Sequence, residues 1–439
     1  MQKTFLLAFI SFFIIQVNAQ NFITPFEKTN GKQTATYFEC INFYKALAKS
    51  YSSIEILTGD TTDAGYPLHL VLFSADKNFN INTWHKQHKI VILINNGIHP
   101  GEPDGIDASM MLLRDLAQGK LKAPQNIALG IIPVYNIGGC LNRNNSTRVN
   151  QNGPESYGFR GNAENLDLNR DFIKADSKNA FAFEKIFHLL NPDIFIDNHV
   201  SDGADYQHTM TMLTTQHNKL EQEIGDFLHD VFEPALYKSM KEKNWQMCPY
   251  VNFEEGDVST GWDAFYDAPR YSTGYTALFE TIGFMPETHM LKPFADRVKS
   301  TYAFEQTVIE ESSKLSNEIT EKRNASIEAI KQQTTFPLSW KVDSSKVDYI
   351  DFKGYDTSMK TSDVTGLPRL FYDHTKPFEK QVKFYNTFVP SISIQKPKAY
   401  IIPHGWHDVI ARLKLNGVIM QQLKNDTTIH VTYYLVDDY

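Results

Sequence analysis

Short runs of apolar residues alternate with longer stretches of helical periodicity between Ile54 and about Tyr302. The apolar runs include HLVLFSA, IVILINN, NIALGIIPVYN and PDIFIDNHV, and the helical stretches include DASMMLLRDLAQGK and AFAFEKIFHLL. Apolar runs without polar alternation are typical of strands that are buried on both faces. The pattern therefore predicts an α/β fold, a three-layer α/β/α sandwich with a mixed twisted sheet in the middle layer.

The pattern changes towards the C-terminus. Residues 295–333 contain neither Gly nor Pro, which predicts one long helix or two in succession. Short alternating stretches such as KVDYIDF, KAYIIP and TTIHVTYYLV follow, and they indicate strands. We therefore expect a large α/β domain over residues 20–335 and a small all-β domain over residues 336–439. The second domain stops at VDDY, just after a strand, which is compatible with an incomplete domain.

The first residues have the pattern of a secretory signal peptide. Lys3 precedes an apolar run from Phe5 to Val17, and the small-residue exit VNA follows. This run is shorter than the roughly 20 residues of a membrane-spanning helix. No cysteine follows the cleavage site, and no later run is long and apolar enough to span a bilayer. We expect residues 1–19 to be removed and the protein to be exported, to a periplasm or out of the cell.

Charge and cysteine content exclude several classes of protein. The formal net charge is -8, and removal of residues 1–19, whose only charge is on Lys3, makes it -9. This balance argues against nucleic acid or an anionic membrane surface as the main partner. Three cysteines allow at most one disulfide, so neither a Cys-rich zinc site nor a disulfide scaffold is expected. The sequence says nothing about the oligomeric state.

Metal-binding residue types follow two of the predicted strands. His99 and Glu102 flank a Pro-Gly corner after IVILI, and His199 follows DIFID. Ligands bind at the carboxyl ends of strands in open α/β sheets, so these side chains are candidates for one site. Two nitrogens and one oxygen suit a zinc ion that keeps one position open. Five alternatives for the third ligand lie within helical patterns or lack the strand-end setting, and we expect them to be ordinary surface or core residues: His188, His208, His217, His229 and His289.

A third segment, FRGNAENLDLNRDF, adds an arginine followed by the motif Asp-Leu-Asn-Arg. With this segment, residues 35–310 resemble the zinc carboxypeptidase family, the carboxypeptidase A-like metallopeptidases. The resemblance implies that His99, Glu102 and His199 hold one Zn²⁺ per chain and that Asp167 orients His99. A histidine that binds a metal usually donates its other N–H to such a carboxylate.

The resemblance also implies how the substrate is held. Asn169 and Arg170 match the residues that bind the free carboxylate at the substrate's C-terminus, a task for which the planar guanidinium is well suited. Arg160, nine residues before Asn169, matches the arginine that stabilises the oxyanion. Arg143 and Arg148 are the alternatives for that role.

For the general base, and for the tyrosine that covers the substrate in this family, the sequence offers more than one candidate. Glu287 lies in PETHMLKPFADRV, which resembles the sequence motif of bacterial members of the family. Glu280 follows the apolar stretch YTALF, as the family's catalytic glutamate follows a strand. We assign the base to Glu287 and keep Glu280 as the alternative. Three tyrosines precede this stretch, and among Tyr266, Tyr271 and Tyr275 we favour Tyr271.

These assignments predict a metallocarboxypeptidase. A zinc-activated water, with a glutamate as general base, would hydrolyse the last peptide bond of a substrate that carries a free carboxylate. One alternative is a zinc amidohydrolase or deacylase that acts on N-acyl amino acids or other small amides. Another is a peptide- or glycan-binding protein whose α/β domain is inactive.

Overall fold

The computed structural model describes residues 22–252, 258–433 and 435. The predicted signal peptide, residues 1–19, lies outside the described residues. Within the described part of the chain, no helix combines the length and the apolar character needed to cross a membrane. Cys40, Cys140 and Cys248 are all buried and unpaired.

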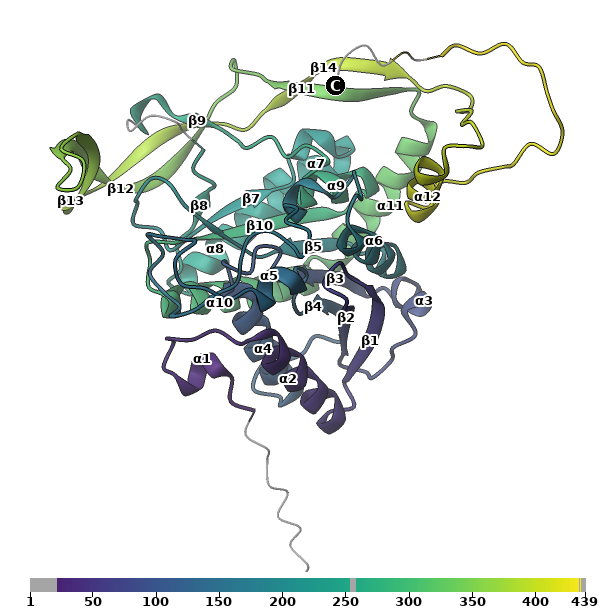
Figure 1. The fold of residues 1–439 in the computed structure, drawn as a ribbon. Helices are drawn as coiled ribbons and strands as arrows, with labels where there is room; N and C mark the ends of the chain where they lie inside the picture. Colours follow the sequence, from purple (N-terminus) through teal and green to yellow (C-terminus); the bar gives the residue numbers. More distant parts are fainter. Residues whose placement is uncertain (1–21, 253–257, 434, 436–439) are drawn as a thin grey trace, which may run out of the picture.

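A nine-stranded mixed sheet forms the middle layer, in the order β1-β2-β4-β3-β5-β10-β7-β8, with β6 paired to β10 (Figure 1). The strands β4, β3, β5 and β10 are parallel. β1 pairs antiparallel with β2, β2 with β4, and β7 with β10, whereas β7 and β8 are parallel. The nine strands are β1 (Ile54–Thr61), β2 (Pro67–Ser74), β3 (Ile90–Asn95), β4 (Ile127–Ile132), β5 (Ile194–Asp197), β6 (His199–Ser201), β7 (Met210–Thr214), β8 (Cys248–Pro249) and β10 (Ile282–His289).

The central strands are buried on both faces, which explains their continuous apolar sequences. In β3, Ile90, Ile92 and Ile94 belong to one hydrophobic core, and Val91 and Leu93 belong to the core on the opposite face. Successive side chains of a strand point to opposite faces, so only an unbroken apolar run can supply both cores. The predicted three-layer sandwich is confirmed.

Helices cover both faces of this sheet. Residues of α2, α4, α7, α8, α10 and α11 pack in the first core, and residues of α3, α6 and α9 pack in the second. The stretch predicted as one or two helices is two, α10 and α11. The α-helices are α1 (Pro25–Lys28), α2 (Tyr37–Ser50), α3 (Ile81–Trp84), α4 (Asp104–Ala117), α5 (Ile137–Leu141), α6 (Lys178–Leu190), α7 (Gln222–Phe227), α8 (Glu233–Glu242), α9 (Ser272–Thr276), α10 (Phe294–Lys314), α11 (Ser316–Gln332) and α12 (His407–Leu415).

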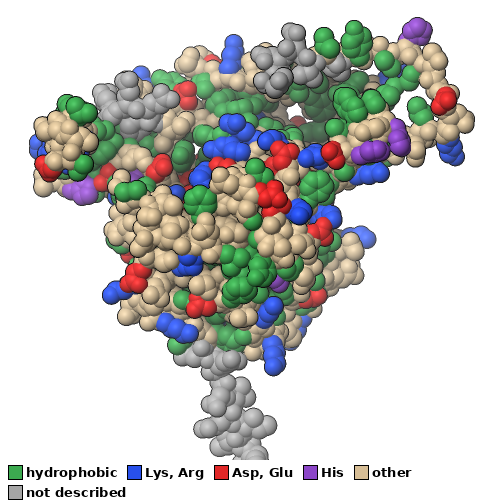
Figure 2. Space-filling model, in the orientation of Figure 1, with side chains coloured by type: hydrophobic (Ala, Val, Ile, Leu, Met, Phe, Trp, Pro, Cys, Tyr) green, Lys and Arg blue, Asp and Glu red, His purple; other side chains and the backbone are tan. Residues whose placement is uncertain are grey.

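The C-terminal segment forms an elongated β region that crosses one side of the sandwich (Figure 1). β11 (Thr335–Val342) pairs with β14 (Phe388–Gln395), and β12 (Asp348–Thr361) pairs with β13 (Pro368–Tyr385). β11 begins at Thr335, next to the predicted boundary, and KVDYIDF leads into β12. The prediction of strands at KAYIIP and TTIHVTYYLV was wrong: neither KAYIIP nor the described residues of TTIHVTYYLV form a strand, and α12 lies between them. Figure 2 shows hydrophobic side chains on the surface of this region. The exposed ones include Leu338, Met359 and Ile392.

The β12–β13 hairpin docks on the sandwich through a small core of its own. Its members come from both parts of the chain and include Tyr206, Trp262, Phe352 and Phe384. The short strand β9 (Trp262–Asp263) extends the hairpin by pairing with β13. The hairpin therefore packs against the segment after β6, which contains Tyr206, and against β9.

Candidate metal centre

The corner between β3 and α4 presents the first two candidate ligands. Its backbone turns tightly, since the N–H of Glu102 donates to the carbonyl of His99 at 2.8 Å. Gly97 enters the corner with φ of 65°, a conformation that favours glycine. A Cβ on Gly101 would lie 2.9 Å from Cδ of Arg148, so the corner also needs glycine at this position. The Pro-Gly sequence therefore allows His99 and Glu102 to point to the same side.

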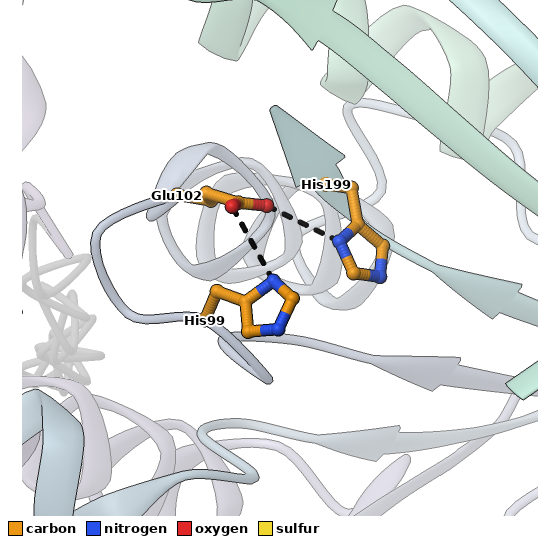
Figure 3. Close-up of side chains that lie close together, drawn as sticks. All are labelled: His99, Glu102 and His199. Atoms are coloured by element: carbon orange, nitrogen blue, oxygen red, sulfur yellow. Dashed lines mark hydrogen bonds and ion pairs between the residues drawn. The ribbon is translucent and has the colours of Figure 1, made fainter. Parts of the chain in front are cut away.

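The three predicted ligands meet at one point (Figure 3). Their potential ligand atoms all lie within 4.8 Å of one another, and all three side chains are buried. Glu102 lies between the two rings, with Oε1 3.3 Å from Nδ1 of His99 and Oε2 3.1 Å from Nδ1 of His199. The parallel strands β3 and β5 end at the same edge of the sheet, which brings the His99 corner next to His199 at the start of β6.

Each histidine has a carboxylate next to its Nε2, the ring nitrogen that faces away from Glu102. Oδ1 of Asp167 lies 2.9 Å from Nε2 of His99, as the family resemblance implies. Oδ2 of Asp197 lies 3.1 Å from Nε2 of His199. If each Nε2–H donates to its carboxylate, both Nδ1 atoms are left as acceptors facing Glu102, the tautomer that a metal ligand needs. Sequence reasoning missed Asp197, although its position two residues before His199 was a usable signal.

The charges of the site favour an ionised carboxylate as the third ligand. Burial by itself would raise the pKa of Glu102, but the charges of Arg148 and His99 outweigh it and hold this pKa well below its usual range. The pKa of Asp167 is also lowered, because hydrogen bonds and charges from His99 and Arg160 overcome its partial burial. Burial by itself would lower the pKa of His199, but the charge of Asp197 and hydrogen bonds to Asp197 and Glu102 raise it well above its usual range, so a zinc ion would have to displace this proton. With that proton released, two imidazole nitrogens and one carboxylate are a donor set that fits Zn²⁺.

Two of the three candidate arginines reach this cluster. Nη1 of Arg160 lies 3.3 Å from Nδ1 of His99 and 3.6 Å from Oε1 of Glu102, while the rest of its guanidinium pairs with Asp167. Nη1 of Arg148 donates to Oε1 of Glu102 at 2.8 Å. Arg143 instead donates to the carbonyls of Ala35 and Ser156.

Of the two candidate bases, only Glu287 lies beside the cluster. It is buried on β10 and pairs in parallel register with His199 on β6. Burial raises the pKa of Glu287 to about 8; His199 opposes this rise and the charge of Glu102 adds to it. Glu280 does not follow a strand, because a helical turn precedes it and β10 begins two residues later. Its side chain accepts from the N–H of Glu221, at the opposite end of β10.

The predicted carboxylate-binding residues continue directly from Asp167. They lie in a single 3-10 turn, Leu168–Arg170, and Oδ1 of Asp167 accepts from the N–H of Asn169 at 3.0 Å. The buried Oδ1 of Asn169 has no hydrogen-bond partner among the described residues. Arg170 and Tyr271 are neighbours, with the guanidinium carbon 4.6 Å from the ring centroid.

The other two tyrosines serve packing instead. Tyr266 stacks on Phe388 of β14, and Tyr275 is fully buried, with its hydroxyl donating to Asn416. Sequence reasoning also missed Tyr250. The pKa of Tyr250 is raised, first by burial and then by the charge of Glu287, so its hydroxyl lies in the field of the candidate base.

A cleft of about 960 Å³ opens beside the cluster. It is bounded by the corner after β3, by the loop after α5, and by the turns that follow β6 and β10. Its lining residues are His99, Gly101, Glu102, Thr147, Arg148, Val149, Asn150, Gly158, Phe159, Arg160, Asp202, Gly203, Met290 and Leu291. Arg170 and Tyr271 are not among these lining residues, so the cleft and the Leu168–Arg170 turn are separate features of the site.

Comparison with known proteins shows which family this part of the chain resembles. The model of the zinc carboxypeptidase family matches residues 40–227, the segment that carries all three candidate ligands, Asp167, Asn169 and Arg170. Residues 40–227 therefore carry a zinc carboxypeptidase domain. The resemblance seen in the sequence is thereby confirmed, and with it the prediction of a metallocarboxypeptidase.

Curated proteins similar to this chain include Carboxypeptidase 2 of Trichophyton rubrum and a probable carboxypeptidase 2 of Arthroderma benhamiae. Each is 22% identical over 87% of this chain, which covers 68% and 70% of the relatives, respectively. Among solved structures, a metallo-carboxypeptidase from Burkholderia cenocepacia is 15% identical, with a TM-score of 0.47 over 64% of this chain and 70% of that one. Carboxypeptidase A from Helicoverpa armigera is 13% identical, with a TM-score of 0.45 over 65% of this chain and 73% of that one.

Proposed function

We propose that this zinc carboxypeptidase is exported and releases residues from the free C-terminus of peptides. One observation supports this most strongly. Asp167, which holds His99, continues directly into Asn169 and Arg170, so the anion-binding pair lies one turn from the ligand cluster. A peptide whose terminal carboxylate binds Arg170 would present its last peptide bond, not an internal one, to the cluster.

His99, Glu102 and His199 would hold the zinc ion, since their donor atoms converge and two carboxylates keep the imidazoles in the required tautomer. When bound, zinc supplies Lewis-acid chemistry and lowers the pKa of water from near 16 to roughly 7. Asp167 and Asp197 keep the rings oriented throughout, and the ionised Glu102 balances part of the metal's charge.

Glu287 would act as the general base. Burial raises the pKa of Glu287, so this carboxyl group holds a proton more strongly than an exposed glutamate. In its ionised form it would accept a proton from water at a carboxylate oxygen and return it to the leaving amine. Arg160, about half exposed and within reach of the ligand atoms, is placed to donate to the oxygen on which negative charge develops.

Arg170 and Tyr271 would define the end of the substrate. Arg170 offers a planar pair of donors to the terminal carboxylate, and Tyr271 packs against its guanidinium face. Closure of Tyr271 over the bound residue would exclude water from the bond being cleaved. Arg270 also packs on this ring, with its guanidinium carbon 5.0 Å from the centroid, but it is not part of the proposed clamp.

The substitution Arg170→Met tests this function, with Arg270→Met as a matched control on the same tyrosine. On a blocked dipeptide with a free C-terminus, we expect Arg170→Met to lower kcat/KM by about 100- to 1000-fold, roughly 3–4 kcal/mol of transition-state binding. Arg270→Met should change it less than about threefold. Full activity of Arg170→Met would contradict the clamp. Hydrolysis of N-acyl amino acids with no cleavage of peptides would favour the deacylase alternative instead.

Export rests on the sequence of residues 1–19, and the described residues contain no helix able to cross a membrane. Expression of the full chain in a bacterium with an active secretion pathway should yield mature protein that begins at Gln20. Mass spectrometry of the intact protein measures this. Retention of Met1 in the product would contradict export through a cleaved signal.

A further inference from the structure

Arg148 contacts both segments that supply the candidate ligands. Its Nη1 donates to Oε1 of Glu102 at 2.8 Å, and its Nη2 donates to the carbonyl of Val200, next to His199, also at 2.8 Å. Glu102 completes the link, because its Oε2 accepts from the N–H of Val200 at 3.0 Å. One guanidinium therefore ties the corner after β3 to the start of β6.

The stem of Arg148 also fits the backbone of that corner. Its Cδ occupies the space that a Cβ on Gly101 would need. Gln151 links Arg148 to Gly101. Its Oε1 accepts from Nε of Arg148 at 2.5 Å, and its Nε2 donates to the carbonyl of Gly101 at 2.9 Å. The glycine of the His-Pro-Gly-Glu sequence is thus matched to an arginine 47 residues later in the chain.

Arg148 is itself held in place. Its N–H donates to the hydroxyl of Tyr157 at 3.1 Å, and that hydroxyl lies 3.3 Å from the carbonyl of Arg148. The side chain is only 16% exposed. Folding has therefore already restricted the arginine, so little entropy remains to be lost when Glu102 binds a metal.

We propose that Arg148 is a positioning residue for the metal, which holds Glu102 and the His199 segment in the ligating arrangement before the ion binds. This inference rests on the proposed zinc site and extends it to a residue that contacts no metal and need not contact the substrate. A cation this close to the site also repels Zn²⁺. The positive charge of Arg148 weakens zinc binding, whereas its positioning of Glu102 strengthens zinc binding. Because the two effects have opposite signs, substitutions can separate them.

Two substitutions at Arg148 separate positioning from charge. Arg148→Lys keeps the charge but loses the fork that binds two partners, and Arg148→Met keeps the stem against Gly101 but loses the charge. Zinc affinity is measured by competition with a chromophoric chelator. We expect both variants to bind zinc about 10- to 100-fold more weakly than the wild type, the usual effect of removing a partner of a metal ligand. Unchanged affinity in Arg148→Lys with tighter binding in Arg148→Met would overturn the inference.

Arg143→Lys and Arg143→Met are the matched controls. Arg143 lies in the same loop, and among the described residues its guanidinium donates to the carbonyls of Ala35 and Ser156. Both controls should keep wild-type zinc affinity, and an equal loss in them would overturn a specific role for Arg148. Urea unfolding of the metal-free proteins checks that each variant folds. If the Arg148 variants do not fold, Gln151→Leu, which removes only the link between Arg148 and Gly101, should still weaken zinc binding by a few fold, and unchanged affinity would overturn the inference.

The same measurement distinguishes failure of the inference from failure of the function. Wild-type protein that binds no zinc would overturn both the proposed function and the role of Arg148. Wild-type protein that binds zinc, with variants that bind it equally well, would overturn the role of Arg148 alone.

Discussion

Glu305 provides a quantitative test of the structure beneath the metal centre. This glutamate on α10 is fully buried, and its Oε1 accepts from Oγ of Ser109 at 2.7 Å and from Nδ2 of Asn198 at 2.9 Å. Asn198 immediately precedes the candidate ligand His199. Burial raises the pKa of Glu305 from 4.5 to about 8, although both hydrogen bonds oppose the rise. The carboxyl group is therefore protonated in the folded protein at neutral pH.

The sign of the effect on stability follows from the raised pKa. The folded state keeps this proton up to about pH 8, whereas the unfolded chain releases it near pH 4.5. The contribution to stability is therefore complete below pH 4.5 and is lost as the pH rises to about 8. A difference of this size between the two pKa values corresponds to a loss on the order of 3–5 kcal/mol. Glu305→Gln preserves the shape and remains neutral at every pH, so it lacks this loss.

Urea unfolding of the metal-free wild type and Glu305→Gln, at pH 5 and at pH 8.5, measures the effect. The other buried acids are common to both proteins, so the difference between their unfolding free energies isolates Glu305. We expect that difference to move by roughly 3–5 kcal/mol in favour of Glu305→Gln as the pH rises. A change below about 1 kcal/mol would show that Glu305 is ionised in the folded state and would refute the reasoning.

Substitutions at three further residues test individual roles at the site. Asp197→Asn should weaken zinc binding by about 10- to 100-fold in a chelator competition, because His199 loses the acceptor that fixes its tautomer; unchanged affinity would contradict the pairing. Glu287→Gln should lower kcat by at least about 100-fold with zinc content unchanged, and near-normal turnover would exclude it as the base. Tyr271→Ala should raise KM for free C-terminal peptides several fold while Tyr271→Phe changes it little, and equal effects of the two would contradict a packing role on Arg170.

The sequence predicted those features of the fold and the site that depend on the order and the ends of the strands. Continuous apolar runs identified β3 and β5, and the rule that ligands gather at the carboxyl ends of parallel strands brought His99, Glu102 and His199 together. The fold class followed from the same pattern. These inferences succeeded because strand ends in one sheet share an edge whatever the details of side-chain packing.

Side-chain contacts between distant segments could not be read in this way. The link from Arg148 to Glu102 spans 46 residues, and nothing in the local sequence distinguishes Arg148 from Arg143. Glu280 was weighed as a base because YTALF looked like a strand, but those residues form helical turns ahead of β10. A short apolar run alone does not separate a buried helical turn from a strand. Asp197 is different, since its spacing from His199 was visible and was overlooked.

The most direct test of the account is mass spectrometry of a mixed peptide pool after incubation with the mature protein. The pool is offered with free and with amidated C-termini, each with and without a zinc chelator. The account predicts stepwise loss of C-terminal residues from the free peptides only, abolished by the chelator and restored by added Zn²⁺. Cleavage of amidated peptides at the same rate, or activity that survives complete removal of zinc, would contradict it.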